Sequence, residues 1–240
     1  MKIYVVIPTY NEAENLPLMA NSLFELAIDN LNLLIVDDNS PDGTGEIAES
    51  LKDKFPTRVS VLHREGKQGL GTAYLQGFDH CLKKGAEAIV QMDADFSHNP
   101  GIVTSLLEQL KEYDLVIGSR YVTGGSLDDN WAAWRKSLSS FGNIYARWIL
   151  RLPIKDVTGG FRAWRRETLL GIPLARVKSQ GYAFQVEMAY IAYAFGYRIR
   201  EIPIYFAERE RGDSKMSLGI QAEAAKRVWS ILYEYRDLKK

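Results

Sequence analysis

Two acidic residues, Asp93 and Asp95, are the clearest candidates for chemistry in this chain of 240 residues. They follow residues 88–92, an apolar run with the length of a buried strand. Alternate residues of an extended segment face the same side, so the two carboxylates should lie together at the rim of the fold, outside its core. Mg²⁺ is typically held by one or two carboxylates, with water and substrate phosphates completing its shell. The pair therefore indicates a divalent-metal site for a donor that carries a diphosphate.

Polar residues also follow three other expected strands. Segments 8–12, 37–44 and 118–121 contain acids, an arginine and the turn-forming residues Asn, Gly and Pro. A single segment of this kind is usually explained by turn chemistry. Because the carboxyl ends of parallel strands meet at one edge of a sheet, all of these segments together with Asp93 and Asp95 favour a ligand site.

The elements that would position these residues alternate between strand and helix. Apolar runs of strand length occupy 3–7, 33–36, 59–62, 88–92 and 115–117. Helical periodicity occupies the segments near 13–27, 43–54, 71–84 and 100–112. This alternation predicts an α/β fold, with a mostly parallel sheet flanked by helices on both faces. Further elements are expected as helices at 131–150, 183–195 and 218–235 and a strand at 197–205. Since no repeat or linker interrupts the chain, one domain over 1–240 is expected.

The composition narrows the function classes. Thirty basic residues balance thirty acidic ones, so the molecule has no overall field to hold nucleic acid. The single Cys81 excludes an internal disulfide and a paired-cysteine metal site. No apolar run has the roughly 18 residues that a membrane helix requires, and Met1 leads directly into a strand-like run without a secretory signal. These features predict a cytoplasmic globular protein.

Residues 131–170 are unusual in carrying eight basic residues against two acidic ones. The helix expected at 131–150 also has an aromatic and apolar stripe, formed by Trp131, Trp134, Leu138, Phe141, Tyr145 and Trp148. Such a stripe is more often packed into a core than placed against a membrane. Trp combined with Arg and Lys favours a bilayer interface instead, and we expect partial membrane docking. A second candidate is the C-terminal stripe of Val228, Ile231, Leu232 and Tyr235.

No Walker A motif and no GxGxxG motif after a strand is present, which argues against P-loop and dinucleotide-binding enzymes. The sequence instead contains VIPTYNE at 6–12, VDDNSPDGT at 36–44 and MDAD at 92–95. Further motifs are GLGTAY at 69–74, GSRY at 118–121, TGGFR at 158–162, QGYAFQ at 180–185 and ERERGDSK at 208–215. The first three resemble family 2 glycosyltransferases, which have the GT-A nucleotide-sugar-binding fold. The others narrow the resemblance to dolichol- and polyprenol-phosphate mannose synthases, in particular the bacterial polyprenol-phosphate enzymes.

The resemblance implies a role for each matching position. The nucleotide pocket would be formed by Pro8, Tyr10, Glu12, Val36 and Asp38. The sugar diphosphate would be bound by Asp93, Ala94 and Asp95, with Asp93 and Asp95 holding Mg²⁺ or Mn²⁺. Some relatives have a Gln at the position of Ser97 that completes the metal shell, so this chain departs from them there.

Basic residues complete the site that the resemblance implies. Arg120, Arg209 and Lys215 would hold the diphosphate, the sugar and the acceptor phosphate, and with Asp95 they form the implied catalytic set. Arg135 and Ser139, four residues apart on one helix, would bind the acceptor phosphate together with Arg120. Residues 1–125 would form the nucleotide-sugar-binding half, and residues 126–240 the half that faces the acceptor and the membrane through C-terminal interfacial helices.

The activity implied is inverting, metal-dependent transfer of mannose from GDP-mannose to a polyprenyl phosphate at the cytoplasmic face of the membrane. The residue chemistry agrees, because a metal with Arg and Lys stabilises a diphosphate leaving group. A lipid phosphate, with a second pKa of about 6, needs no strong base. Two alternatives stay open: transfer of glucose or N-acetylglucosamine from a UDP-sugar, and a noncatalytic membrane adaptor with the same fold. A separate membrane protein could anchor the chain.

Overall fold

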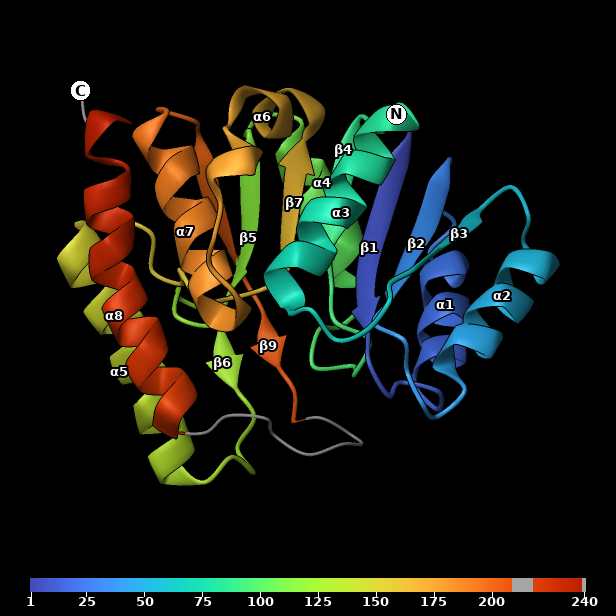
Figure 1. The fold of residues 1–240 in the computed structure, drawn as a ribbon, viewed down its shortest axis with the longest axis horizontal. Helices are drawn as coiled ribbons and strands as arrows, with labels where there is room; N and C mark the ends of the chain where they lie inside the picture. The colour runs from blue at the N-terminus through green and yellow to red at the C-terminus, as the bar shows by residue number, and fades with distance from the viewer. Residues whose placement is uncertain (209–217, 239–240) are drawn as a thin grey trace.

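A seven-stranded sheet forms the centre of the molecule in the computed structural model (Figure 1), which describes residues 1–208 and 218–238, with only the backbone for 218–224. In spatial order its strands are β3 (Val59–His63), β2 (Leu31–Asp37), β1 (Ile3–Thr9), β4 (Ala88–Gln91), β7 (Arg162–Arg165), β5 (Leu115–Ser119) and β8 (Ile199–Pro203). All neighbouring pairs are parallel except those of β7 with β4 and β5. A small parallel pair is formed by β6 (Ser126–Leu127) and β9 (Tyr205–Phe206). The predicted mostly parallel sheet is confirmed.

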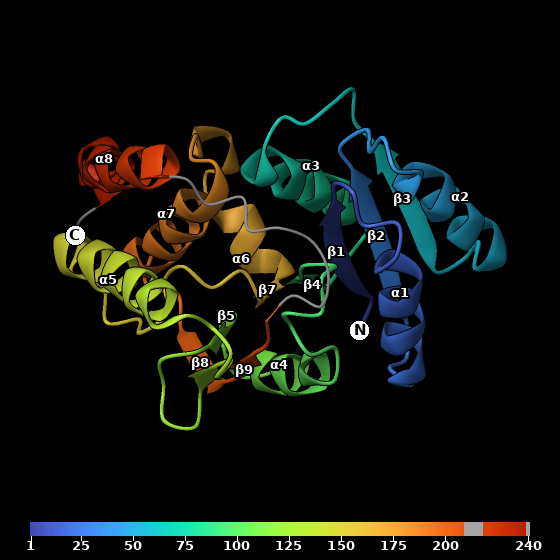
Figure 2. The ribbon, with the colours of Figure 1, turned by 90° about the horizontal axis from the view of Figure 1, so that it is seen from below.

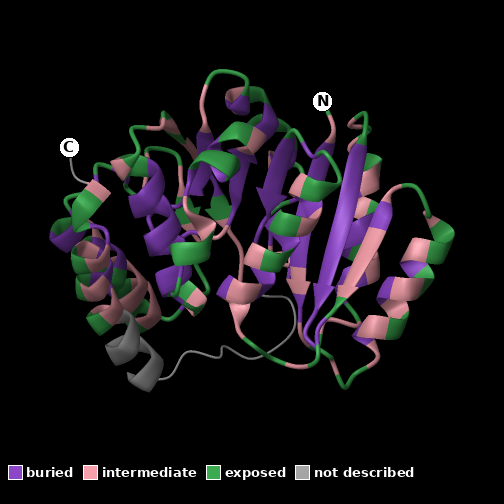
Figure 3. Cartoon of the chain, turned by 45° about the horizontal axis from the view of Figure 1, so that its top comes forward, coloured by how far each residue is buried: buried purple, intermediate pink, exposed green. Residues whose placement is uncertain are grey.

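Helices cover both faces of the sheet, as Figure 2 shows from the end at which β1 and β2 finish. One face carries α1 (Leu16–Glu25), α2 (Thr44–Lys54) and α4 (Ile102–Leu110). The other carries α3 (Leu70–Lys83), α6 (Arg166–Gly171) and α7 (Gly181–Ala194). Each face has its own apolar cluster, because the continuous apolar runs of the strands present large side chains to both sides. Figure 3 shows the result, with buried strands between helices that mostly expose their outer side, whereas α7 is buried on nearly all sides.

Two long helices, α5 (Ala133–Leu150) and α8 (Leu218–Glu234), lie side by side beyond α7, at the end of the molecule opposite α1 and α2 (Figures 1 and 2). Their buried side chains, among them Ala146, Ile149 and Ile231, extend the cluster on the α7 side. Val228, Ile231 and Tyr235 are at most 4% exposed, so the expectation that the C-terminal stripe faces a membrane is wrong. The helices at 131–150, 183–195 and 218–235 are thus confirmed with small shifts of their ends. None of the helices that the structure describes is long and apolar enough to cross a bilayer.

The antiparallel strand β7 is the strand of the central sheet that the sequence pattern missed. It lies between β4 and β5 in the middle of the sheet, although it begins with Arg162. The fully buried Arg162 guanidinium donates hydrogen bonds to the carbonyl oxygens of Gly159 (2.9 Å), Val157 (2.8 Å) and Gln185 (2.8 Å). Burial lowers the pKa of Arg162 to about 10, so the side chain stays charged at neutral pH. Because β7 runs against its neighbours, the loop before it lies at the edge where the parallel strands end.

Arg162→Met tests this buried arginine. The substitution keeps an apolar stem but leaves three buried carbonyl groups without their donor, and we expect it to lower the free energy of unfolding by about 3 kcal/mol or more. Urea denaturation followed by circular dichroism measures this loss. The matched control is Arg165→Met at the other end of the strand, whose guanidinium donates to the carbonyls of Leu110 and Lys111 at the surface and should cost about 1 kcal/mol. Equal losses for the two variants would contradict the role assigned to Arg162.

Candidate active site

The loops after β1 and β2 form one side of the candidate site and are tied to each other. The Thr44 hydroxyl accepts a hydrogen bond from the backbone N–H of Glu12 at 2.9 Å, and Asp42 accepts one from the N–H of Ala13 at 3.1 Å. Asp42 also accepts from the N–H of Thr44 at 3.1 Å, at the first turn of α2. These contacts hold the segment containing Pro8, Tyr10 and Glu12 beside the segment containing Val36 and Asp38, as a shared pocket requires.

Asp38, directly after β2, forms an ion pair with Arg64, directly after β3. Both side chains are buried, and burial raises the pKa of Asp38 even though the Arg64 charge opposes this effect. Arg64 also donates to Gln68 (3.2 Å) and to Thr72, so it joins Asp38 to the glycine-containing loop that enters α3. The ammonium group of Lys67, in that loop, lies 4.4 Å from the centre of the Tyr10 ring. A positive loop and an aromatic ring therefore face each other here.

Gly69 allows this loop to pass close to the start of α7. Its φ is +97°, and a Cβ there would lie 2.5 Å from Oε1 of Gln180. A side chain at this position would be strained by the positive φ and would displace the Gln180 side chain, so glycine is favoured. The close approach joins the GLGTAY and QGYAFQ motifs, which are about a hundred residues apart in the sequence, at one edge of the sheet.

Asp93 and Asp95 lie just beyond β4, but not as predicted for a surface rim. The chain bends after the strand, with Phe96 at φ +59°, and Asp95 is only 4% exposed while the Asp93 side chain keeps about a third of its exposure. The expectation that Asp95 lies outside the core is therefore wrong. The hydroxyl and the backbone N–H of Ser97 donate to Oδ1 of Asp95 at 2.6 and 3.1 Å. Ser97 thus orients the Asp95 carboxylate.

His98 supports the backbone of Asp93. Its Nδ1 accepts a hydrogen bond from the backbone N–H of Asp93 at 3.2 Å, and its ring stacks on Phe161 with the ring centres 4.8 Å apart. Burial lowers the pKa of His98, so the imidazole is neutral at neutral pH. A neutral ring whose Nδ1 is occupied in this way positions the chain at Asp93.

The two carboxylates fit a hard divalent cation. Among the residues that the structure describes, no three His, Cys, Asp or Glu side chains gather closely enough to hold a metal ion alone. Two carboxylates at a ligand-binding edge match the way Mg²⁺ is usually bound, with phosphate oxygens and water supplying the remaining ligands. The donor set therefore suits a cation that arrives with a diphosphate.

Arg120, after β5, is held in a buried ion pair with Asp156. The Arg120 Nε and Nη2 atoms donate to the two Asp156 oxygens, both at 2.7 Å, and Nη2 also donates to Thr158 at 2.8 Å. Burial acts to raise the pKa of Asp156, but the charge and the hydrogen bonds of Arg120 together outweigh it, and the pKa lies below its ordinary value. Burial likewise acts to lower the pKa of Arg120, and Asp156 reverses that effect. Arg120 is thus a fixed positive charge at the edge of the sheet.

The predicted acceptor residues lie next to this pair. The Tyr121 and Ser139 hydroxyls are 2.9 Å apart, which places α5 against the chain segment that carries Arg120. Arg135, one turn earlier on α5, donates to Glu208 at 3.2 Å and lies over the Trp131 ring at 3.8 Å. The structure therefore brings Arg120, Ser139 and Arg135 to one side of the site. Arg209 and Lys215 lie outside the described residues.

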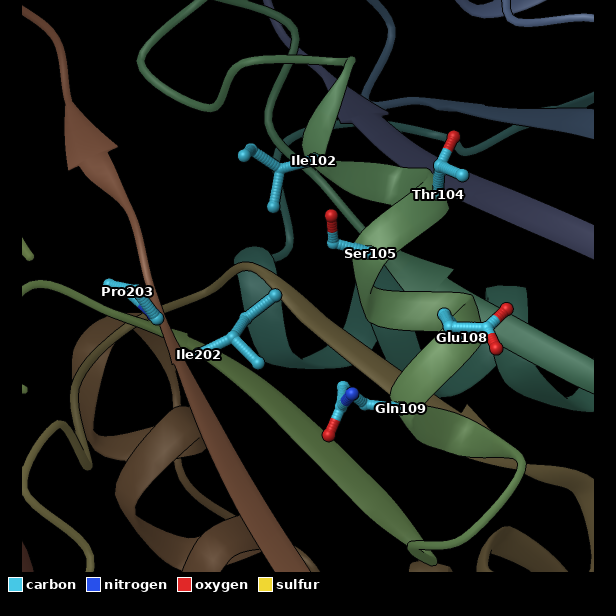
Figure 4. Close-up of a pocket in the computed structure, with 7 residues that line it drawn as sticks. All are labelled: Ile102, Thr104, Ser105, Glu108, Gln109, Ile202 and Pro203. Carbon is cyan, nitrogen blue, oxygen red and sulfur yellow. The ribbon is translucent and has the colours of Figure 1, made fainter. Parts of the chain in front are cut away.

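Two further hollows contain none of the predicted site residues. One, of about 410 Å³, lies between α4 and β8 and is lined by residues such as Ile102, Ser105 and Ile202 (Figure 4). The other, of about 710 Å³, lies between α5 and α8 and is lined by residues such as Arg147, Trp148 and Trp229. The first belongs to the flank of the sheet. The second belongs to the face that the aromatic stripe of α5 helps to form.

Several contributing residues escaped the sequence analysis. Arg64 lacks a motif of its own, and its partner Asp38 is 26 residues away. Asp156 is equally consistent with a turn until its contact with Arg120, 36 residues away, is known. Gln185 belongs to a motif that had been singled out, but nothing in the spacing points to its side chain. These residues come together only in the folded chain, so local sequence patterns do not reveal their contacts.

The fold and the site define a glycosyltransferase, and comparison with known proteins agrees. Residues 4–170 match the family model described as glycosyl transferase family 2, and the chain belongs to this family. It is 46% identical to undecaprenyl-phosphate mannosyltransferase of Micrococcus luteus, over 100% of this chain and 98% of that protein. It is 47% identical to polyprenol monophosphomannose synthase of Mycolicibacterium smegmatis, over 95% of this chain and 86% of that protein.

Solved structures confirm the predicted GT-A fold. Glucosyl-3-phosphoglycerate synthase from Mycobacterium tuberculosis, in complex with Mn²⁺, UDP and glucosyl-3-phosphoglycerate, has a TM-score of 0.65. The match covers 97% of this chain and 79% of that chain at 18% identity. Another match, described as a mycobacterial protein, has a TM-score of 0.67 at 19% identity and covers 96% of this chain and 73% of that chain. At these identities, the likeness concerns the fold alone.

Asp156→Asn tests the buried pair. The variant keeps the shape of Asp156 but leaves the Arg120 charge buried without its counter-charge, and we expect a loss of about 3–5 kcal/mol in the free energy of unfolding at pH 7. Because the folded pKa of Asp156 lies below its unfolded value of about 3.9, the stabilisation is present above that pH and is lost as pH falls through the folded pKa.

Denaturation curves between pH 7 and pH 3 should therefore show the difference between wild type and Asp156→Asn shrinking once the pH is below about 4. Asp79→Asn, which removes a surface pair with Lys83, is the control and should cost no more than about 1 kcal/mol. A small loss that does not vary with pH in Asp156→Asn would show that the pair does not carry the energy assigned to it.

Proposed function

We propose that this glycosyltransferase moves mannose from GDP-mannose to a polyprenyl phosphate with inversion at the anomeric carbon. The observation that carries the proposal is the near full-length relationship to two lipid-phosphate mannose enzymes, combined with the placement of Asp93, Asp95 and Arg120 at one sheet edge. In this reaction a phosphate oxygen of the lipid forms a bond to C1 of mannose as the bond from C1 to the diphosphate breaks. GDP is the leaving group, and no electrons are exchanged with another molecule.

The donor would lie along the loops of the carboxyl edge. The nucleoside would occupy the pocket of Pro8, Tyr10, Glu12, Val36 and Asp38. Asp93, Ala94 and Asp95 would lie beneath the diphosphate, with Asp93 and Asp95 holding Mg²⁺ or Mn²⁺. When bound, the cation would neutralise charge that develops on the leaving diphosphate. Glucosyl-3-phosphoglycerate synthase, which has a related fold, has been solved with Mn²⁺ and UDP, and this supports a divalent cation in the proposed reaction.

Positively charged side chains would bind both the donor diphosphate and the acceptor phosphate. Arg120 is already oriented by Asp156, so it needs no rearrangement to face an anion, and such preorganisation is a major source of catalysis. We assign Arg209 and Lys215 to the same catalytic set with Asp95. The acceptor phosphate would be bound by Arg120, Arg135 and Ser139. A lipid phosphate with a second pKa of about 6 is largely deprotonated at pH 7, which removes the need for a general base.

The acceptor half would face a membrane. On α5, Trp134, Phe141 and Trp148 recur every seven residues and are 69%, 66% and 79% exposed. Trp229 and Tyr233 of α8 are exposed as well, and Arg147 and Arg151 line the hollow between these helices. Aromatic side chains beside arginine suit the boundary between headgroups and hydrocarbon. We propose peripheral binding to the cytoplasmic leaflet through α5 and α8, where a separate membrane protein could add an anchor.

This arrangement divides the work along the chain. Residues 1–125 would bind the nucleotide-sugar, and residues 126–240 would bind the acceptor and the membrane.

The structure limits which residues of the aromatic stripe of α5 would contact a membrane. Trp131 packs against Phe206 inside the protein, with ring centres 5.7 Å apart, so only part of the stripe is available to a membrane.

Asp95→Asn provides the test of the reaction. Radiolabelled GDP-mannose, polyprenyl phosphate and Mn²⁺ should give a labelled lipid that is extracted into organic solvent. Asp95→Asn keeps an oxygen that can accept from Ser97 but loses the charge needed by the cation, and transfer should fall about a hundredfold or more. Asp79→Asn should retain wild-type transfer. Label transfer from UDP-glucose alone would favour the UDP alternative, and no transfer from either donor would favour the noncatalytic adaptor.

Trp134→Ser combined with Trp148→Ser tests membrane binding. Burying one large apolar side chain is worth about 1.5–3 kcal/mol, so losing two should weaken binding to anionic vesicles by about a hundredfold or more. Binding by wild type should also weaken as salt is raised, because charge at the surface is screened. Leu18→Ser removes a comparably exposed apolar residue from α1, at the far end of the molecule, and should have no effect (Figure 1). Cosedimentation that is insensitive to the tryptophans would rule out this face.

A further inference from the structure

Gln185, in the second turn of α7, has a buried side chain that the fold does not use. It is 2% exposed, and neither its Oε1 nor its Nε2 has a hydrogen-bond partner among the residues that the structure describes. An unpartnered buried polar group destabilises the folded state relative to a paired one. An apolar side chain of the same size would avoid this cost. The amide is therefore unfavourable for folding alone.

The surroundings place this amide beside His98, the residue that supports the Asp93 segment of the candidate active site. A Cβ atom built on Gly160 would lie 3.4 Å from Nε2 of Gln185 and 3.8 Å from Cε1 of His98, so the two side chains flank the same glycine. His98 in turn accepts the backbone N–H of Asp93 at 3.2 Å. Gln185 thus lies one side chain away from the segment that carries the two carboxylates.

Gln185 is also firmly positioned. Its carbonyl oxygen accepts a hydrogen bond from Arg162 at 2.8 Å. The preceding Phe184 stacks on Tyr74, with ring centres 5.9 Å apart, and the Tyr74 hydroxyl is 3.4 Å from Oδ1 of Asp93. Arg162 and Phe184 therefore fix the backbone of Gln185 relative to Asp93, while the side-chain amide of Gln185 stays unpaired.

We propose that Gln185 binds the hydroxyl groups of the donor sugar, an assignment that rests on the proposed function. The unpaired Oε1 requires a donor and the unpaired Nε2 requires an acceptor. A deprotonated phosphate offers acceptors only, and a divalent cation would satisfy the oxygen but not the N–H group. A sugar hydroxyl both donates and accepts, so neighbouring hydroxyls can satisfy both atoms. An amide at this position holds the sugar without competing for a proton.

Gly160 contributes to the same subsite by lacking a side chain. The contacts that its Cβ would make are ordinary van der Waals distances, so alanine fits the folded protein. Its methyl group would nevertheless occupy space between Gln185 and His98. Gly160→Ala therefore obstructs the subsite without the loss of a polar group, which makes it an independent second variant.

Binding of GDP and of GDP-mannose, both with Mn²⁺, to wild type, Gln185→Met and Gly160→Ala tests the proposal by calorimetry. Methionine matches the length of glutamine and removes both polar atoms. We expect the Kd for GDP to change by less than twofold in both variants and the Kd for GDP-mannose to rise about tenfold, since about 1.4 kcal/mol corresponds to each factor of ten. The melting temperature of ligand-free Gln185→Met should be unchanged or higher than that of wild type, because the fold gains nothing from the amide.

The outcomes separate this inference from the proposed function. If wild type binds GDP-mannose and both variants bind it equally well, the sugar subsite is wrong and the proposed donor stands. A lowered melting temperature in Gln185→Met with unchanged GDP-mannose affinity would make the amide a structural group and overturn the proposal. If wild type binds neither GDP nor GDP-mannose, the proposed donor itself fails, and the assignment of Gln185 that rests on it falls as well.

Discussion

The buried ion pair of Arg120 and Asp156 connects the parts of this molecule that must act together. Arg120 follows the parallel strand β5, whereas Asp156 precedes the antiparallel strand β7. Asp156 also accepts the backbone N–H groups of Arg120 and Gly159 at 3.0 and 2.9 Å, so the pair fixes both chain segments and not only two side chains. A buried pair of this kind has a large cost when one partner is removed. The loop that it holds contains Gly160 and leads directly to Arg162.

The charged side chains at the carboxyl edge of the sheet are arranged so that a diphosphate with a divalent cation would pair with both signs of charge. Two carboxylates, Asp93 and Asp95, lie on one side, and the positive side chains of Arg120 and Arg135 lie on the other. Ser97 orients Asp95, His98 holds the backbone of Asp93, and Asp156 and Glu208 hold Arg120 and Arg135. A diphosphate with a divalent cation bridges such an arrangement, because the cation is held by acids and the phosphates by bases. This complementarity links the fold to glycosyl transfer.

The sequence predicted the parts of the fold that local patterns determine. Strands such as β1 and β2 are continuous apolar runs buried on both faces, and the acids that follow them fall at the expected edge. Strand β7 escaped prediction because Arg162 is a charged residue at a buried position, and its charge is solvated by three carbonyl groups that only the folded chain brings together. The burial of Asp95 escaped because the chain turns at Phe96, with φ +59°, instead of continuing as an extended segment. Ion pairs across 26 and 36 residues, those of Asp38 and Asp156, depend on tertiary structure in the same way.

A crystal structure with GDP-mannose and Mn²⁺, with data collected at the manganese absorption edge, is the most direct test of the central claim that this edge binds a nucleotide-sugar through its carboxylates. The account predicts an anomalous peak between the diphosphate and the carboxylates of Asp93 and Asp95. It also predicts the nucleoside beside Asp38 and the diphosphate facing Arg120. A manganese ion or a nucleotide bound elsewhere, for example in the hollow between α4 and β8, would contradict the account.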